Sequence, residues 1–321
     1  MTDPGSTSTV RGGWHFRPGH RVIGPLDLAM QPPVNAGDIP LNVHLVFSED
    51  GIYVPAVVMT PEGPGPFPAV ICLHGGSGGL GASWLVDFVV NRGYVFERLV
   101  REGYAVVWTE GRKEIEYAYG TDIPAVLDHN DVINTFKYVQ NLSFVDETRV
   151  GFFGVSHGGE LQMKVISELK DGPAALIPSE PAVIEYLDFR FEGPREEWNL
   201  QFNDDLTDDQ VDLERALERI EPISPDLPIL ILGRDSDHLQ GLFRKLYELL
   251  ERSGKNVQWE SFDHPEHAYH WGPIRSQKVV GYEGSVADVE GTYETDPLQE
   301  ATLARVLDFL NEHVKNASPS G

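Results

Sequence analysis

The stretch of sequence that decides the fold is Arg149-Val150-Gly151-Phe152-Phe153-Gly154-Val155-Ser156-His157-Gly158. Its first half is apolar and predicts a buried strand, and residues 160–169 have the pattern of a helix. Ser156 would lie at the sharp turn between them, with its hydroxyl exposed above the sheet, which is the context of a nucleophile elbow. Glycines two positions before and after the serine leave room for this turn. An ordinary glycine turn gives the same pattern, so the partners of Ser156 must separate the two interpretations.

The composition limits the partners of the chain. It has 321 residues with 41% apolar content, enough for a sizeable core, and its formal net charge is −25. Nucleic acid and anionic membrane surfaces would repel such a protein, so neither is expected as a partner. The single cysteine, Cys72, lies in an apolar run and excludes an intrachain disulfide. We find no hydrophobic signal core and no bilayer-spanning run, which predicts a cytoplasmic protein.

Short apolar runs alternate with helical patterns along most of the chain. Strands are expected twice within 41–60 and then at 69–73, 104–109, 149–153, 174–177, 227–232 and 257–262, the last strand that the pattern indicates. Helices are expected at 84–101, with an interruption near Gly93, and at 131–142, 160–169, 239–253 and 297–314. This alternation predicts an α/β fold, a mostly parallel sheet with helices on both faces.

The expected domain organisation is one core with an insertion. Residues 1–40 are polar and then rich in proline and glycine, and are expected to be an irregular arm and surface segment. Residues 41–180 and 223–316 form the core, and residues 181–222 interrupt it. The interruption is acidic yet carries bulky aromatic residues, among them Phe191 and Trp198. We expect a cap or lid in which these two line the substrate pocket; anchoring of the insertion to the core is the alternative.

A general base for Ser156 is found after the strand expected at 257–262. His267 lies in Asp263-His264-Pro265-Glu266-His267-Ala268-Tyr269-His270, on the loop where the base belongs. Its histidines are three residues apart, a spacing that would suit a metal on a helical face. Pro265 breaks a helix there, so we expect no metal, and His264 and His270 are expected at the surface or behind the base.

An acid to orient the base is expected in Gly233-Arg234-Asp235-Ser236-Asp237-His238, just after the strand at 227–232. Asp237 and Asp235 are both candidates. Asp237 could instead cap the next helix, because Asp237 and Gln240 have capping-box spacing. Asp235 could instead be a turn residue paired with Arg234.

Donors for a developing oxyanion are expected from the backbone. One is the N–H of His157, directly after the nucleophile, and the other comes from His74-Gly75-Gly76. Gly76 is the first choice and Gly75 the second, because a missing side chain lets the amide approach a substrate oxygen. A phosphate-binding loop is the alternative, but neither a following Gly-Lys-Ser/Thr nor dinucleotide spacing is present.

At this point the chain resembles the serine α/β-hydrolases, and among them the dienelactone hydrolase-like and prolyl oligopeptidase-like branch. The resemblance extends over residues 52–314 and rests on four motifs. These are His74-Gly75-Gly76, Gly154-Val155-Ser156-His157-Gly158-Gly159, Pro265-Glu266-His267 and Tyr293-Glu294-Thr295-Asp296-Pro297. It implies a Ser-His-Asp triad on an α/β-hydrolase fold with no cofactor.

Two departures from the branch concern the substrate and the acid. Dienelactone hydrolases use a cysteine where this chain has Ser156, which puts a lactone substrate in doubt. The branch places its acid three residues after the strand-end glycine, at Ser236 here. Related polyester and cutinase-type hydrolases have a G-x-D-x-D form in which the second aspartate serves. Gly233-Arg234-Asp235-Ser236-Asp237 is similar to that form, which favours Asp237 over Asp235.

The leading hypothesis is therefore a serine esterase that cleaves small carboxylic esters through an acyl-enzyme. A peptidase of the prolyl oligopeptidase type is the first alternative, although the residues before 41 are too few for a propeller domain. A non-catalytic relative that binds a ligand is the second alternative, although such proteins usually lack a triad member. Formation of a homo-oligomer is compatible with the sequence.

Overall fold

The computed structural model describes the chain over most of its length. The described residues are 34–36, 39–48, 51–76, 81–109, 112, 125–169, 172–194, 201–273, 275–283 and 286–316. The arm expected at residues 1–13 and the irregular segment up to residue 33 lie outside these ranges.

The elements follow the predicted alternation. The strands are β1 (Val34–Ala36), β2 (Ile39–Phe47), β3 (Tyr53–Met59), β4 (Phe67–Leu73), β5 (Ala105–Thr109), β6 (Val145–Val155), β7 (Ala175–Ser179), β8 (Ile229–Arg234), β9 (Val257–Phe262), β10 (Arg275–Glu283) and β11 (Val286–Tyr293). The α-helices are α2 (Gly81–Arg92), α3 (Tyr94–Arg101), α5 (Ala125–Gln140), α6 (His157–Val165), α7 (Leu213–Ile220), α8 (Gln240–Arg252) and α9 (Pro297–Leu310).

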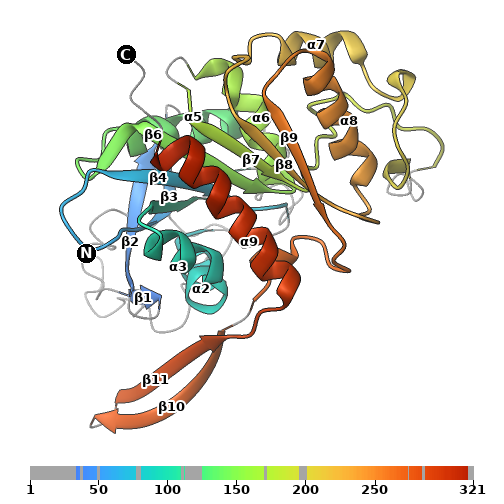
Figure 1. Ribbon diagram of the computed structural model, residues 1–321. Coiled ribbons are helices and arrows are strands. Elements are labelled where there is room, and N and C mark those ends of the chain that lie inside the picture. The colour runs from blue at the N-terminus through green and yellow to red at the C-terminus, as the bar shows by residue number, and fades with distance from the viewer. Residues whose placement is uncertain are drawn as a thin grey trace, which may run out of the picture.

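Nine strands form one sheet in the order β1-β2-β3-β5-β4-β6-β7-β8-β9. The first four strands of this order pair antiparallel, and all pairs from β5-β4 to β8-β9 are parallel. Helices cover both faces of the sheet (Figure 1). The predicted mostly parallel α/β architecture is confirmed. Because the carboxyl ends of parallel strands lie at one edge, the loops after β4, β6, β7, β8 and β9 meet there.

Apolar strands buried on both sides separate two cores. Along β4, Ile71 packs in the core beneath α5, α6 and α8, and its neighbours Val70 and Cys72 pack in the core beneath α2, α3 and α9. All three side chains are fully buried. Side chains that alternate between two apolar layers explain why this strand is a continuous hydrophobic run.

Local signals place several helix ends where the sequence indicated. The expected interruption near Gly93 separates α2 from α3. A Cβ at Gly93 would lie 2.1 Å from the carbonyl oxygen of Val89, so this junction requires glycine. The N-cap of α9 is Asp296, whose side chain accepts hydrogen bonds from the amides of Leu298 and Gln299. This cap satisfies amides that the first turn of a helix leaves without partners.

Two stretches differ from the prediction. The segment expected to be irregular up to residue 40 contributes β1 and the start of β2, which pair antiparallel. The last strand that the sequence pattern indicated was β9, but β10 and β11 follow it as a separate hairpin that projects from the molecule (Figure 1). A two-stranded ribbon is stabilised by local pairing and does not need the apolar run that marks a buried strand.

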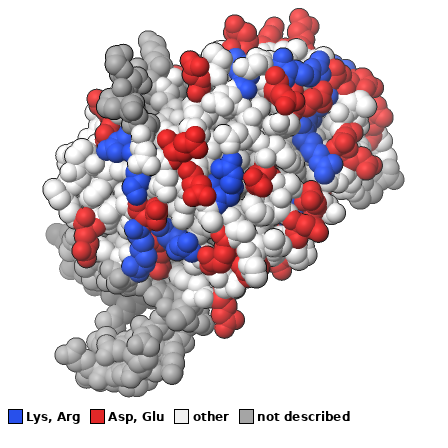
Figure 2. Space-filling view, in the orientation of Figure 1, with Lys and Arg blue, Asp and Glu red and all other residues white. Residues whose placement is uncertain are grey.

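The segment at 181–222 packs against the core and is tied to α8. Its buried residues Tyr186, Phe202 and Ile220 belong to the same apolar core as the strands. A Cβ at Gly241, in the first turn of α8, would lie 2.1 Å from the carbonyl oxygen of Asp204, so only glycine permits this close approach. Figure 2 shows acidic side chains spread over one face, with basic side chains among them and both kinds gathered around α7 and α8.

No helix within the described ranges has the length and apolar character that crossing a bilayer requires.

Candidate active site

The turn between β6 and α6 holds Ser156 in a strained conformation. Its φ of 54° and ψ of −116° are unusual for a residue with a side chain. The amide of Ser156 donates to the carbonyl oxygen of Ser179 on β7, at 2.9 Å, which fixes the turn against the next strand. A Cβ at Gly154 would lie 2.4 Å from the carbonyl oxygen of Gly158, and one at Gly158 would lie 2.4 Å from that of Leu73. Both glycines are therefore required by the close approach of strand and helix, as the sequence predicted.

The loops after β8 and β9 bring one candidate acid and the candidate base together. The Nδ1–H of His267 donates to Oδ2 of Asp237 at 2.8 Å. Asp237 is buried, and its Oδ1 accepts the amide of Leu239 at 2.7 Å. Two guanidinium N–H groups of Arg234 donate to Oδ2 at 2.9 and 2.6 Å. The carboxylate is thus fixed from three sides with one oxygen on the imidazole.

A second carboxylate reaches the same imidazole. Oε2 of Glu180, the residue directly after β7, lies 2.8 Å from Nδ1 of His267. Glu180 is buried, and its Oε2 also accepts the amide of Ala268 at 2.7 Å. No motif in the sequence singled out this residue. The available signal was its position, because it immediately follows a strand whose carboxyl end lies at the edge where the other candidates gather.

The two acids change the protonation of the imidazole. Burial alone would lower the pKa of His267, but its hydrogen bonds to Asp237 and Glu180 and their charges raise that pKa to about 9. Burial alone would raise the pKa of Asp237, but the hydrogen bond and charge of His267 lead the effects that lower it to about 2. The two hydrogen bonds therefore stabilise the imidazolium that forms when His267 takes up a proton.

The other candidate acid has a different environment. Asp235 is exposed, and its Oδ1 accepts the hydroxyl of Ser261 at 2.8 Å. The guanidinium of Arg244 lies 3.7 Å from the same oxygen. The expected pairing of Asp235 with Arg234 is not found, since Arg234 bonds Asp237 instead. Only Asp237 of the two is brought to His267, although it also receives the amide of Leu239 as a local cap.

The neighbouring histidines of the base loop have separate partners. His264 lies 3.1 Å from Oδ2 of Asp296 through Nε2 and stacks on Tyr269. His270 is buried, stacks on Phe153, and lies 3.1 Å from the hydroxyl of Ser179 through Nε2. Burial lowers the pKa of His270 to about 4. Of the three, His267 alone lines the cavity described below.

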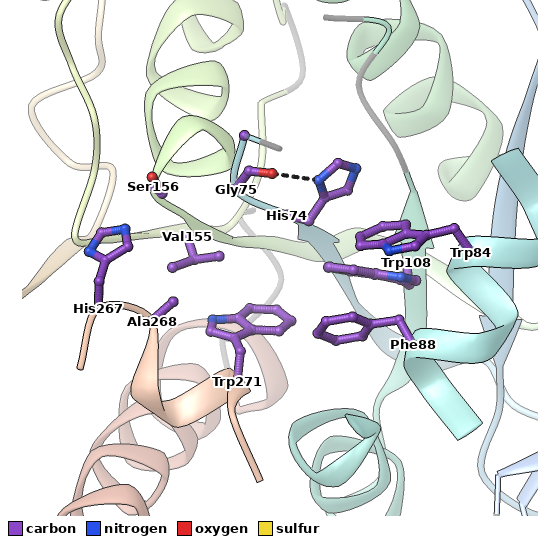
Figure 3. A pocket seen from close by; sticks show the side chains of 11 residues that line it. His74, Gly75, Trp84, Phe88, Trp108, Val155, Ser156, His267, Ala268 and Trp271 are labelled. Atoms are coloured by element: carbon purple, nitrogen blue, oxygen red, sulfur yellow. Dashed lines mark hydrogen bonds between the residues drawn. The ribbon is translucent and has the colours of Figure 1, made fainter. Parts of the chain in front are cut away.

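The loop after β4 runs beside Ser156. A Cβ at Gly75 would lie 3.1 Å from Cβ of Ser156 and 3.7 Å from its Oγ. The carbonyl oxygen of Gly75 accepts Nδ1–H of His74 at 2.7 Å, and Figure 3 shows this carbonyl pointing away from Ser156. In a trans peptide the next N–H points opposite to the carbonyl, so the amide of Gly76 is directed toward the side of Ser156. Burial lowers the pKa of His74 to about 4, so its ring is neutral.

The residue after Ser156 has a buried side chain of its own. Nε2 of His157 lies 3.3 Å from Oδ2 of Asp128, and its Nδ1 lies 3.7 Å from Oε2 of Glu160. Burial alone would lower the pKa of His157, but the hydrogen bonds to these carboxylates raise it to about 9. These contacts hold the first turn of α6, whose backbone N–H groups face the elbow.

A cavity of about 180 Å³ opens beside Ser156 and His267 (Figure 3). Its wall is mostly apolar and aromatic and comes from α2, β5 and the loop after β9. The lining residues are His74, Gly75, Gly76, Trp84, Phe88, Trp108, Val155, Ser156, His267, Ala268 and Trp271. The place of the three tryptophans in this wall could not be predicted from the sequence, because they lie far apart in the chain and become neighbours only when the sheet forms.

Of the two aromatic residues expected to line the pocket from the insertion, only Phe191 lies within the described residues, and it is not found there. Phe191 is half-buried and packs edge-on against Phe189 and Phe202, at 5.1 and 5.8 Å between ring centres. It is not among the described residues that line the cavity. Trp198 lies outside the described residues.

One group in the site has ligand atoms close enough for a metal ion. Asp237, His238 and His267 each offer an atom within 4.8 Å of the others. Arg234 donates twice to the same carboxylate, so a cation bound there would face a guanidinium. This donor set therefore fits a hydrogen-bonded pair better than a metal centre.

Comparisons with known proteins identify the fold. No family model matches the sequence, and no curated protein matches it either. Solved structures do match. One of two fungal esterases from Rhizomucor miehei superposes with a TM-score of 0.61 at 15% identity, over 88% of this chain and 86% of that one. The chain has the α/β-hydrolase fold.

Two further structures share the α/β-hydrolase fold with this chain. Brefeldin A esterase, a bacterial homologue of human hormone sensitive lipase, has a TM-score of 0.58 at 15% identity, over 89% of this chain and 80% of that one. A putative dienelactone hydrolase from Klebsiella pneumoniae has a TM-score of 0.55 at 14% identity, over 85% of this chain and 99% of that one.

Proposed function

We propose that the protein is a carboxylic-ester hydrolase with Ser156 as nucleophile, His267 as base and Asp237 as acid. The observation that carries the proposal is the 2.8 Å bond between Asp237 and Nδ1 of His267, at the rim of a cavity that Ser156 also lines. The esterases among the similar structures support the same class of reaction.

The proposed reaction has two halves. The Oγ of Ser156 attacks the ester carbonyl carbon and its proton passes to Nε2 of His267. The oxyanion accepts hydrogen bonds from the amides of His157 and Gly76, each contributing about 3 kcal/mol to lowering the barrier. Collapse of the intermediate breaks the C–O bond, and the alcohol leaves with the proton from His267. Water, deprotonated by His267, then attacks the acyl-enzyme and releases the acid.

The cavity suggests which part of an ester is recognised. Its aromatic wall and volume of about 180 Å³ suit a compact apolar acyl or alcohol group, which would leave water on binding. The reaction needs no cofactor. The partner is thus a small-molecule ester with at least one compact apolar side.

The decisive experiment replaces the nucleophile. Ser156→Ala should lower the turnover of p-nitrophenyl esters by several orders of magnitude while the melting temperature changes little. A fluorophosphonate should label the wild-type protein and fail to label the variant. Turnover in the variant close to wild type would contradict the proposal. Release of the amine from an aminoacyl anilide at a comparable rate would instead indicate a peptidase.

A further inference from the structure

Two buried carboxylates converge on one ring nitrogen in the site. Nδ1 of His267 carries one N–H, and it lies 2.8 Å both from Oδ2 of Asp237 and from Oε2 of Glu180. Either acid alone would fix the tautomer and orient the ring. The carboxylates come from different loops, after β8 and after β7, and both reach the same ring nitrogen.

The charges around these acids are not equal. Arg234 donates two hydrogen bonds to Asp237, so the charge of that carboxylate is largely balanced by a guanidinium. Glu180 accepts a neutral backbone amide, that of Ala268. With Arg234 and Asp237 offsetting each other, an imidazolium at His267 finds its counter-charge in Glu180. Nδ1 of His270 lies 3.9 Å from the other oxygen of Glu180, and the lowered pKa of His270 leaves that ring neutral.

The backbone supports this role for Glu180. Its φ of 43° places it in the left-handed region, as does the φ of 58° at Ala268. Such conformations cost about 1–3 kcal/mol for residues with side chains, and they gather at functional sites. The amide of Glu180 donates to the carbonyl oxygen of Leu232 at 2.8 Å, and its carboxylate bonds the amide of Ala268. Two strained residues are thus joined through the carboxylate that faces the base.

We propose that Glu180 is a second positioning acid, which holds His267 together with Asp237 and supplies the counter-charge for its protonated form. This rests on the proposed function insofar as it concerns turnover. The proposal predicts a smaller loss of turnover when Asp237 is replaced, because the Glu180 carboxylate still holds Nδ1 of His267. Its effect on the imidazole is independent of any substrate.

The first test follows the imidazole and does not depend on turnover. In protein with ¹⁵N-labelled histidine, the ring signals of His267 are assigned by their loss in His267→Gln, and they are titrated with pH. Glu180→Gln should lower the pKa of His267 by about one unit or more, because it removes the uncompensated charge while retaining the side-chain size. Asp235→Asn is the matched control, since it removes an equal charge from an exposed site without a bond to His267.

Other charged groups near the ring define the remaining controls. His238 stacks edge-on against His267 at 4.9 Å between ring centres and is half-exposed. His264 and His270 flank the base in its own loop, and Arg234 lies behind Asp237. These groups are unchanged in Glu180→Gln, so a shift of the His267 titration reports the lost carboxylate.

The second test measures turnover in a double-mutant cycle. Where one acid serves the base alone, its loss costs about 10⁴-fold in turnover. With two acids, Glu180→Gln and Asp237→Asn should each cost about 10–100-fold, and the double variant should lose about 10⁴-fold. The acidic limb of the kcat/KM profile should move to lower pH in Glu180→Gln.

Two results would overturn the proposal. One is an unchanged His267 titration in Glu180→Gln, and the other is a double variant no slower than Asp237→Asn. Either would reduce Glu180 to a structural ligand of the Ala268 amide. If no ester is hydrolysed at all, the proposed function fails, and the titration still decides the role of Glu180.

Discussion

Two aromatic clusters in this molecule differ in what their rings contact: one lines the cavity, and the other packs on the core. The pocket-side cluster consists of Trp84, Phe88, Trp108 and Trp271, and its rings line the cavity beside Ser156. The insertion cluster consists of Phe189, Phe191 and Phe202, which pack on one another and on the core. Both clusters are aromatic, and the sequence favoured the insertion as the substrate wall. The packing in the described residues instead corresponds to the alternative, in which the insertion aromatics act as an anchor.

The clusters also differ in the groups that they enclose. His74 packs against Trp84 and Trp108, and His270 packs beside Trp271, so titratable rings lie within the pocket-side cluster. The ring contacts of the insertion cluster in the described residues involve phenylalanines only. Aromatic content alone therefore does not distinguish a substrate wall from an anchor. The surroundings of the rings do, and substitutions in the two clusters should differ in their effects on protein stability, on its pH dependence and on substrate preference.

The largest effect is expected where the insertion cluster is most deeply buried. Phe202 is 1% exposed, and Phe202→Ala should lower the free energy of unfolding by about 3–5 kcal/mol, through lost burial and a cavity. The ratio of kcat/KM between a short and a long ester should stay as in wild type. Urea unfolding and an ester series measure the two quantities. A changed ester ratio without loss of stability would make this cluster part of the substrate site.

The next effect concerns the buried histidine of the pocket-side cluster. The pKa of His270 is lowered to about 4 in the folded protein, against its usual 6.5 in the unfolded chain. Between these values the unfolded chain binds a proton that the folded chain does not, so stability present above pH 6.5 is lost as the pH falls. At pH 5 the loss is about 2 kcal/mol.

Replacement of that histidine should remove its share of the pH dependence. His270→Gln retains a hydrogen-bonding group for Ser179, and it should lose less stability than wild type between pH 7 and pH 5. Phe191→Ala serves as control, because its free energy of unfolding should fall as much as that of wild type between pH 7 and pH 5. Denaturant unfolding at the two pH values measures this. If His270→Gln and wild type lost the same free energy of unfolding between pH 7 and pH 5, the His270 ring would not change its protonation on folding.

A smaller effect is expected on substrate preference from the cavity wall. Phe88 is half-buried on α2, lines the cavity, and stacks on Trp108 at 5.1 Å between ring centres. Phe88→Ala should enlarge the cavity and change the ratio of kcat/KM between small and bulky esters by about tenfold, as expected for an altered apolar pocket. The comparison of clusters fails if this ratio is unaffected.

The smallest effect is the matched substitution in the insertion. Phe191 is half-buried like Phe88, but its ring contacts Phe189 and Phe202. Phe191→Ala should lower the free energy of unfolding by about 1 kcal/mol and leave the ester ratio unchanged. The pair Phe88→Ala and Phe191→Ala therefore compares equal chemical changes in the two clusters. A tenfold change of preference in Phe191→Ala would restore the hypothesis of a lid.

The sequence predicted much of the site because several signals are local. Gly154 and Gly158 flank Ser156 at the spacing that the elbow needs, and the nearby carbonyl groups of Gly158 and Leu73 leave no room for a side chain there. His267 and Asp237 could be proposed because each follows a predicted strand, and parallel strands end at a common edge. Gly93 marked the interruption between two helices through backbone sterics that involve only near neighbours.

Other features could not be predicted because they depend on contacts between distant segments. Glu180 is one acidic residue among many until β7 places it against His267. No periodicity in the sequence marked the hairpin of β10 and β11, whose strands pair outside the main sheet. Asp235 and Asp237 have the same side chain, and only the folded loop directs Asp237 to Arg234 and His267 and Asp235 to Ser261 at the surface.

The sequence by itself determined the order of strands and helices, the sharp turn at Ser156 and the loop of the base. These follow from hydrophobic periodicity and from glycine sterics, which act within a few residues. Tertiary structure decided which carboxylates face His267 and which aromatic rings enclose the cavity. Those choices depend on burial, because removal from water makes each charge or ring select partners from segments far away in the chain.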